Sequence, residues 1–184
     1  MKNTATDTSI ANGLETPNES KNRQPERSHT KCMFSKSNFV AFRTVPVILK
    51  NGNRKIRVNA LLDDASTTSF VNADVAAELG LQGKMEKITT SILNDRTETF
   101  VTMPVELGLE STDGNIDMIL SAYTATKVTG DLQVVDWQKV GSSWSHLQSI
   151  DFPKTVSPPI VDILIGMDYP NLHFSHKDVC AHSI

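Results

Sequence analysis

Short runs of alternating apolar and polar residues fill the sequence from residue 39 onward. The first two runs, Phe39–Leu49 and Lys55–Leu62, favour β-strands, and a short polar segment containing Asn51-Gly52 separates them. Asn-Gly between two such runs is a strong hairpin signal. In the second run alternate positions are apolar, so one face of that strand should be apolar and the other mostly polar. The pattern therefore predicts a β-hairpin whose second strand ends at Asp63.

One short helix is predicted after these strands. Asn72 is a suitable N-cap, Ala73–Leu79 favours a helix, and Gly80 can adopt the left-handed conformation that ends one. The segment Val135–Pro159 contains several prolines and is predicted to be an irregular connection, with one helical turn around Ser143–Leu147.

Further apolar runs predict four more strands, at Lys87–Leu93, Glu98–Leu109, Ile116–Thr124 and Ile160–Ile165. Many short strands with little helix favour a mainly β fold, and in particular a small closed β-barrel with one or two short helices. The sequence shows no convincing internal repeat.

The first 37 residues have a different composition. They are dominated by Asn, Thr, Ser, Glu, Lys and Arg, with few large apolar residues. Such a segment buries too little surface to offset the entropy lost on ordering, so residues 1–37 are predicted to be a disordered tail or linker. The 184 residues suffice for one domain with a core, expected over residues 38–176, followed by a C-terminal tail at 177–184.

Charge and composition argue against several classes of ligand. The net charge is -3, and no run of Lys or Arg forms a stripe that could follow a phosphate backbone, so nucleic acid is not expected as a ligand of this domain. Apolar stretches fall far short of the roughly 20 residues that a membrane span needs, so no membrane association is expected. Two cysteines near opposite ends, without a signal-peptide pattern, favour an intracellular, cytoplasmic location.

Two groups of His and Cys residues are candidate metal ligands. His29 and Cys32 lack a second pair at zinc-knuckle spacing, and the C-terminal group has a spacing that fits no standard site: His173, His176, Cys180 and His182. Both groups are interpreted as tail sequence, and neither a metal nor an organic cofactor is expected.

The most informative segment runs from Ala60 to Val71. An apolar strand delivers Asp63 into a turn of small and hydroxyl residues, and an apolar pair follows. A strand of this kind holds the carboxylate in place, and small neighbours leave room for a second chain and a water molecule. Ser66 and His146 with an aspartate could form a hydrolase triad, but no Gly-x-Ser-x-Gly nucleophile elbow surrounds that serine, which argues against this alternative.

This segment resembles the catalytic loop of the retropepsin-like aspartic proteases encoded by BEL/Pao retrotransposons, which commonly reads Ala-Leu-Leu-Asp-x-Gly-Ser. The match covers Ala60–Asp63 and Ser66. A second stretch about a hundred residues later, Val161–Tyr169, is similar to the family's apolar strand ending in Ile-Gly-x-Asp. In this chain the residues of that motif are Ile165, Gly166 and Asp168.

The resemblance implies an aspartic endopeptidase on a retropepsin-type barrel, with a polyprotein as its substrate. Asp63 would be the catalytic residue. Because the sequence has only one such loop, a working site would need a homodimer in which each chain contributes one Asp63. Two carboxylates held close together share one proton, so that one acts as the base for a bound water and the other as the acid.

The resemblance also suggests roles for neighbouring residues. Asp64, Ala65 and Ser66 would complete the active-site loop, with Ser66 hydrogen-bonded to the outer oxygen of Asp63. The family's flap, a hairpin that closes over substrate, would fall between Ile88 and Val101, with its tip near Asn94, Asp95 and Arg96. The second motif would pack beneath the active site, where its glycine makes a tight exit from the strand.

Two positions depart from the family pattern. Ala65 stands where Gly is usual, and Asp64 replaces a hydroxyl residue, which would bring four carboxylates near the twofold axis of a dimer. These departures favour the alternative of a catalytically inactive retropepsin-like module for dimerisation or peptide binding. A nucleocapsid-like fragment was the third alternative, disfavoured by the acidic balance and the absence of complete zinc knuckles.

Overall fold

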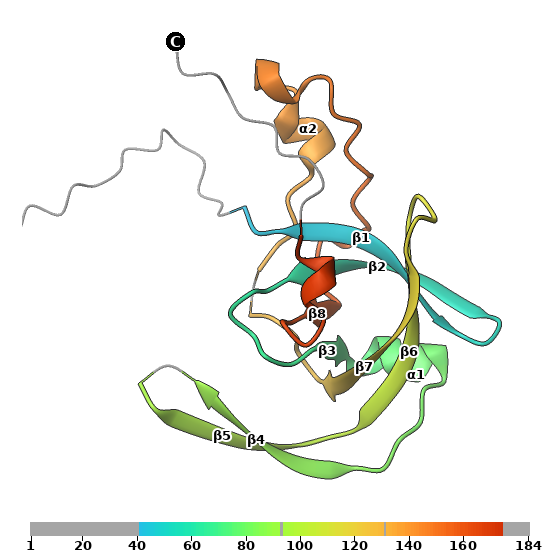
Figure 1. Ribbon diagram of the computed structural model, residues 1–184, viewed down its shortest axis with the longest axis vertical. Coiled ribbons are helices and arrows are strands. Elements are labelled where there is room, and N and C mark those ends of the chain that lie inside the picture. The colour runs from blue at the N-terminus through green and yellow to red at the C-terminus, as the bar shows by residue number, and fades with distance from the viewer. Residues whose placement is uncertain (1–40, 93, 131, 175–184) are drawn as a thin grey trace, which may run out of the picture. The chain divides into compact units, whose positions relative to one another are not determined.

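The computed structural model describes residues 41–92, 94–130 and 132–174. Six strands close a mixed barrel in the order β1-β2-β8-β3-β7-β6 (Figure 1). The predicted fold class is confirmed, because the described chain is mainly β, with a closed barrel and two short helices. The barrel strands are β1 (Thr44–Asn51), β2 (Arg54–Leu62), β3 (Phe70–Asn72), β6 (Pro104–Ser111), β7 (Asp117–Ala125) and β8 (Ile163–Ile165).

Strands β1 and β2 form the predicted hairpin, but its turn lies one residue later than the Asn-Gly pair suggested. Asn51 pairs with Arg54, so the two residues of the turn are Gly52 and Asn53. Gly52 has a positive φ of 57°. Glycine at the first central position is typical of a type II′ turn, which matches the twist of the two strands.

The end of β2 is buried on both faces, so the predicted polar face is wrong there. Asn59 is fully buried, and its side-chain amide donates to the carbonyls of Val156 and Ile160, while Val156 N–H donates to its Oδ1. Segments distant in sequence therefore cover the outer face of β2, which strand periodicity alone does not reveal.

The predicted helix is confirmed as α1 (Ala73–Leu79), with the Asn72 side chain accepting from Asp74 N–H and Gly80 left-handed at the C-terminal end. The strand before it, β3, was not predicted. Its three residues pair with β7 in parallel and with β8 in antiparallel. A run of three residues is too short for periodicity to identify.

The long run predicted as one strand from Glu98 to Leu109 is divided at Met103. The part before the break, β5 (Arg96–Thr102), pairs with β4 (Glu86–Ile92) in a separate two-stranded sheet, and the part after it is β6. Thr102 Oγ1 donates to the carbonyl of Thr124 over 2.7 Å, so a contact between neighbouring segments marks the change of sheet. Figure 1 shows the β4–β5 hairpin as a curved arm below the barrel in this view.

The connection between β7 and β8 is more ordered than predicted. The helical turn is present at Ser145–Leu147, but a further helix, α2 (Trp137–Gly141), precedes it. Asp136 caps α2 by accepting from Lys139 N–H, and the Trp137 ring stacks on Phe152 with centroids 5.8 Å apart. A cap and a distant aromatic contact thus support a helix whose own sequence is too short to predict it.

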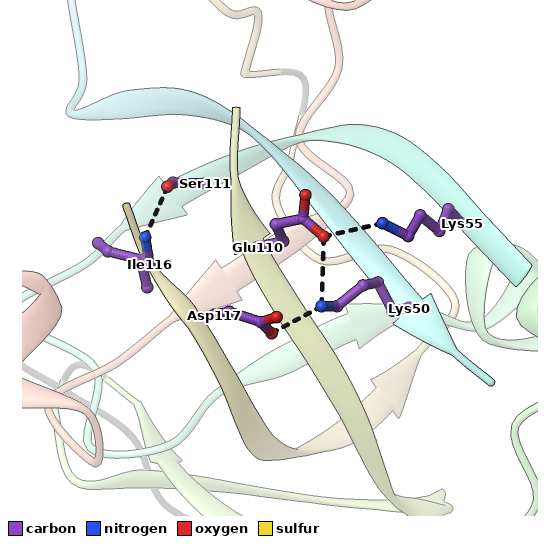
Figure 2. A network of polar contacts seen from close by, with 6 residues as sticks. All are labelled: Lys50, Lys55, Glu110, Ser111, Ile116 and Asp117. Carbon is purple, nitrogen blue, oxygen red and sulfur yellow. Dashed lines mark hydrogen bonds and ion pairs between the residues drawn. The ribbon is translucent and has the colours of Figure 1, made fainter. Parts of the chain in front are cut away.

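Charged side chains bridge the strands where β1 meets β6 and closes the barrel (Figure 2). Lys50 Nζ lies 2.6 Å from Asp117 Oδ1 and 3.2 Å from Glu110 Oε2, and Lys55 Nζ lies 3.0 Å from the same Glu110 oxygen. Lys55 and then Lys50 hold the pKa of the Glu110 carboxyl below its usual value. The network therefore links β2, β1, β6 and β7.

Three sequence predictions lie outside the described residues. They are the boundary of the tail at residue 37, the C-terminal tail at 177–184, and the two groups of His and Cys residues apart from His173. Within the part of the chain that the structure describes, no helix is long and apolar enough to cross a membrane.

Candidate active site

Asp63 lies at the end of β2, where the strand leaves the barrel. Leu62 is paired in parallel with Ile165 of β8, and Asp63 N–H donates to the Ile165 carbonyl over 3.0 Å. The half-buried Asp63 carboxylate accepts a 3.0 Å hydrogen bond from Ala65 N–H through Oδ1. The strand therefore fixes the backbone of Asp63, and the next turn fixes one oxygen of its carboxylate.

The loop after Asp63 lies directly against the second motif. Met167 N–H donates to the Ser66 carbonyl over 2.7 Å. A Cβ atom added at Gly166 would lie 2.8 Å from Ser66 O and 2.9 Å from both N and O of Thr68, distances that real Cβ atoms essentially never show. The absence of a side chain at Gly166 is thus what lets β8 approach the Asp63 loop.

Asp168 fastens the far end of the same loop. Its carboxylate accepts from Ser69 N–H over 2.9 Å and from Ser69 Oγ over 2.8 Å, and Ser69 Oγ in turn accepts from Gly166 N–H over 3.1 Å. Ser69 is fully buried. The three residues of the second motif, Ile165, Gly166 and Asp168, therefore all contact the segment that carries Asp63.

Ser66 does not make the hydrogen bond expected from the resemblance. A serine hydroxyl has one proton to donate, and that of Ser66 goes to the Thr68 carbonyl over 2.8 Å. The Asp63 carboxylate instead accepts a hydrogen bond from the backbone N–H of Ala65. Ser66 shapes the loop, and the backbone positions the carboxylate.

Ala65 fits the loop without strain in its own chain. Among the non-glycine residues that the structure describes, only Asn94 and Asp95 have a positive φ, so Ala65 does not need the left-handed conformation that glycine would favour. Ala65 and its neighbour Asp64 are both exposed. The two residues that depart from the expected pattern are therefore accessible on the surface of the described chain.

The other aspartates considered near the motifs have different positions. Asp136 caps α2 and Asp168 binds Ser69. Asp162 lies at the entry to β8, where its backbone N–H donates to Asn59 O and burial raises the pKa of its carboxyl. None of these three carboxylates stands at a strand end in a turn of small residues, as Asp63 does.

The hairpin that the resemblance suggests as a flap is present as a separate two-stranded sheet. Strands β4 and β5 pair from Glu86↔Thr102 to Ile92↔Arg96, somewhat beyond the predicted range of Ile88 to Val101. Asn94 and Asp95 occupy the turn with φ of 63° and 55°, and Arg96 begins β5. Asn and Asp tolerate positive φ better than most residues, so this sequence suits a tight turn.

A pocket of about 530 Å³ adjoins Asp63 and Asp64. Its wall is largely apolar and comes from the segment before β1, the end of β2, the β7–β8 connection and β8. The apolar lining includes Phe42, Leu62, Val128, Leu132 and Leu164. Such a pocket beside a carboxylate can take an apolar side chain of a bound peptide.

Sequence reasoning missed several residues of this site. Ser69 appeared only as one of several hydroxyl residues, and Val128 and Leu132 lie in a connection that carried no motif. Their roles depend on strands that meet only in the folded chain. The described residues contain no group of three or more His, Cys, Asp or Glu side chains that could hold a metal ion.

Fold and site together define a small mainly β protein with a closed six-stranded mixed barrel and a carboxylate presented at the end of one strand. No protein-family model matches the sequence, and no curated protein matches it.

Proposed function

We propose that this chain is an aspartic endopeptidase of the retropepsin type, similar to those of BEL/Pao retrotransposons, and that it acts as a homodimer. The observation that carries the proposal is the fastening of the Asp63 loop to β8. Asp63 N–H bonds to Ile165 O, Gly166 gives the loop room, and Asp168 holds Ser69. Two motifs that resemble one family in sequence thus form one continuous structure.

In the proposed mechanism each chain contributes one Asp63 carboxylate to a pair. One member of the pair is ionised and removes a proton from a water molecule, whose oxygen attacks the scissile carbonyl carbon. The other member is protonated and donates to the carbonyl oxygen. When the tetrahedral intermediate collapses, the C–N bond breaks and the carboxyl that took the water proton donates it to the amine nitrogen. The other carboxylate recovers its proton from a hydroxyl of the intermediate as the C=O bond forms again, so the pair returns to its starting state. The two carboxylates titrate as a unit, so the rate should have a bell-shaped pH dependence.

The surroundings of Asp63 suit a peptide substrate. The apolar pocket beside Asp63 would receive a substrate side chain, and the β4–β5 hairpin would cover the bound peptide. The mechanism uses only carboxylates and water, so the proposed reaction requires neither a metal nor an organic cofactor.

The alternative is an inactive module of the same fold that binds a peptide or a second copy of the chain. The exposed Asp64 favours it. In a dimer, the Asp64 carboxylates would add two negative charges to those of the Asp63 pair, and like charges disfavour close contact.

The deciding experiment is cleavage of a mixed fluorogenic peptide library by the full chain from pH 4 to 7. Asp63→Asn removes the proposed acid–base group and should lower the rate about 10²–10⁴-fold, the contribution of a positioned acid or base. Asp151→Asn is the matched control, because Asp151 is exposed and lies in the β7–β8 connection.

Equal activity in Asp63→Asn and Asp151→Asn would contradict the proposal. Sedimentation of the unmodified chain distinguishes the alternatives further. A dimer without cleavage at any of these pH values would identify the inactive module.

A further inference from the structure

The β4–β5 hairpin has two faces that differ in exposure. Antiparallel partners share a face, so residues at alternate positions of β4 and β5 fall into two sets. Every member of one set is exposed: Lys87, Thr89, Ser91, Thr97, Thr99 and Val101. The other set contains the half-buried Ile88, Thr90 and Phe100 and the buried Thr102, together with the exposed charged residues Glu86, Arg96 and Glu98. Among the side chains of β4 and β5 that the structure describes, every buried or half-buried one therefore lies on this second face.

Phe100 makes the ring contact between that face and the barrel. Its centroid lies 6.3 Å from that of Phe70 in β3, with the ring planes inclined by 44°. The Phe70 ring in turn lies 6.2 Å from that of Tyr123 in β7. Tilted aromatic pairs at these separations are favourable beyond the apolar area that they bury.

Phe70 belongs to the segment that also carries Asp63. The residue before it, Ser69, is held by Asp168, and Phe70 itself pairs with Leu164 of β8 and Tyr123 of β7. The Phe70 ring is therefore fixed relative to the Asp63 loop. A side chain that docks on Phe70 takes its position from the same framework as the candidate catalytic carboxylate.

The base of the hairpin has a second attachment. Thr102 Oγ1 donates to Thr124 O over 2.7 Å, and Met103 N–H donates to Thr124 Oγ1 over 3.0 Å. These bonds lie at the junction with the barrel, whereas Phe100 is two residues further toward the tip. One attachment at the junction leaves a two-stranded arm free to pivot, and an isolated two-stranded hairpin is marginally stable. The contact of Phe100 with Phe70 is a second attachment, and together the two attachments fix the direction in which the hairpin extends from the barrel.

We infer that Phe100, docked on Phe70, is a positioning residue that holds the β4–β5 hairpin at a set distance from the Asp63 loop and so prepares the site to bind a peptide. The inference rests on the proposed function for its kinetic part only. An ordered cover reduces the entropy that is lost when substrate binds, so Phe100 acts on substrate capture rather than on the chemical step.

The test compares the full chain with Phe100→Ala, Phe100→Leu and Val101→Ala. Val101 is the matched control because it is the next residue of β5 and lies 54% exposed on the opposite face. In Phe100→Ala, amide hydrogen exchange in β4 and β5 should accelerate about tenfold, the factor for a loss of about 1.4 kcal/mol, while β1, β2 and β7 stay unchanged. Phe100→Leu should restore part of the protection, and Val101→Ala should match the unmodified chain.

The kinetic readout separates positioning from catalysis. For a cleaved peptide, Phe100→Ala should raise KM about tenfold and change kcat much less, because uniform binding is lost and the transition state is otherwise unaffected. A fall in kcat with constant KM would overturn the inference, as would hairpin exchange equal to that of the unmodified chain. Faster exchange throughout the barrel would also overturn it, since Phe100 would then be an ordinary core residue.

The exchange measurement does not need enzymatic activity. If the unmodified chain cleaves no peptide while Phe100→Ala accelerates exchange only in the hairpin, the proposed peptidase function is wrong and the positioning role of Phe100 is supported. If the unmodified chain cleaves peptides and exchange in the hairpin is the same in Phe100→Ala, the peptidase function is supported and the positioning role of Phe100 is wrong.

Discussion

The Asp63 loop and the β4–β5 hairpin both connect strands near the candidate site, but they are held in different ways. The loop is bonded to β8 through backbone groups and the buried Ser69, and a glycine lets the two segments touch. The hairpin has one fully exposed face and reaches the barrel through Phe100 and Thr102. A firmly bonded Asp63 loop and a lightly attached hairpin are what the proposed peptidase needs, because its site would have to admit and then enclose an extended chain.

The substitution Gly166→Ala should have the largest effect, and it tests whether the Asp63 loop is packed as tightly against β8 as this comparison requires. The added methyl would meet backbone atoms of Ser66 and Thr68 at 2.8–2.9 Å, and backbone cannot move aside as a flexible side chain can. We expect a loss of about 3 kcal/mol in the free energy of unfolding, the upper part of the usual range for overpacking. Urea unfolding measures this loss.

Gly130→Ala is the matched control for that substitution. A Cβ at Gly130 meets nothing within 4 Å, and its φ is not in the left-handed region, so little change is expected. Equal urea-unfolding midpoints for the two variants would mean that the loop and β8 are not tightly packed. The loop would then be held no more firmly than the hairpin.

A smaller effect is expected from removing one hydroxyl in each region. Ser69→Ala leaves Asp168 Oδ1 and Gly166 N–H without their buried partner and should cost about 1–3 kcal/mol. Thr99→Val removes an exposed hydroxyl pair with Thr89, 2.7 Å long, and should change the free energy of unfolding by less than about 0.5 kcal/mol. Calorimetry of both variants compares the stability lost in the two regions. A larger loss for Thr99→Val than for Ser69→Ala would mean that the hairpin, and not the loop, is the more firmly held region.

The smallest effect is expected where the barrel closes. Glu110→Gln weakens the bridges to Lys55 and Lys50, and ion pairs near a protein surface usually contribute little to stability. Because these lysines lower the pKa of Glu110 in the folded chain, its carboxylate stabilises the fold above the usual pKa of 4.5, and that stabilisation is lost as the pH falls through the lowered value. The variant should therefore melt below the unmodified chain at pH 7 and converge with it in acid.

High salt provides a second check on the same substitution, since it should reduce the difference between the two melting temperatures at pH 7. A difference that persists at pH 3 would show that Glu110 acts through packing rather than charge.

Local patterns predicted the barrel well where a residue's neighbours in sequence decide its conformation. The α1 cap at Asn72 and its end at Gly80 came from short-range hydrogen bonding and from the freedom of glycine, and both are present. The strand leading to Asp63 also lies where its pattern predicts. The turn at Asn94 and Asp95 was expected from the family resemblance and not from a local pattern.

Prediction failed where distant segments decide the outcome. Asn59 was assigned to a polar face, yet the β7–β8 connection covers it and satisfies its amide. The break at Met103 follows from bonds to Thr124, and β3 exists because β7 and β8 lie on either side of it. The Ser66 hydroxyl was expected on Asp63 but bonds to Thr68, because the loop turns back on itself.

The sequence by itself determined the strand-rich pattern, the helix with its caps and the release of Asp63 from an apolar strand, since each depends on residues a few positions apart. Tertiary structure alone decided that Gly166 and Asp168 fasten the Asp63 loop and that Phe100 docks on Phe70. The physical reason is that these contacts join segments 30 to about 100 residues apart, and such segments meet only when the barrel closes.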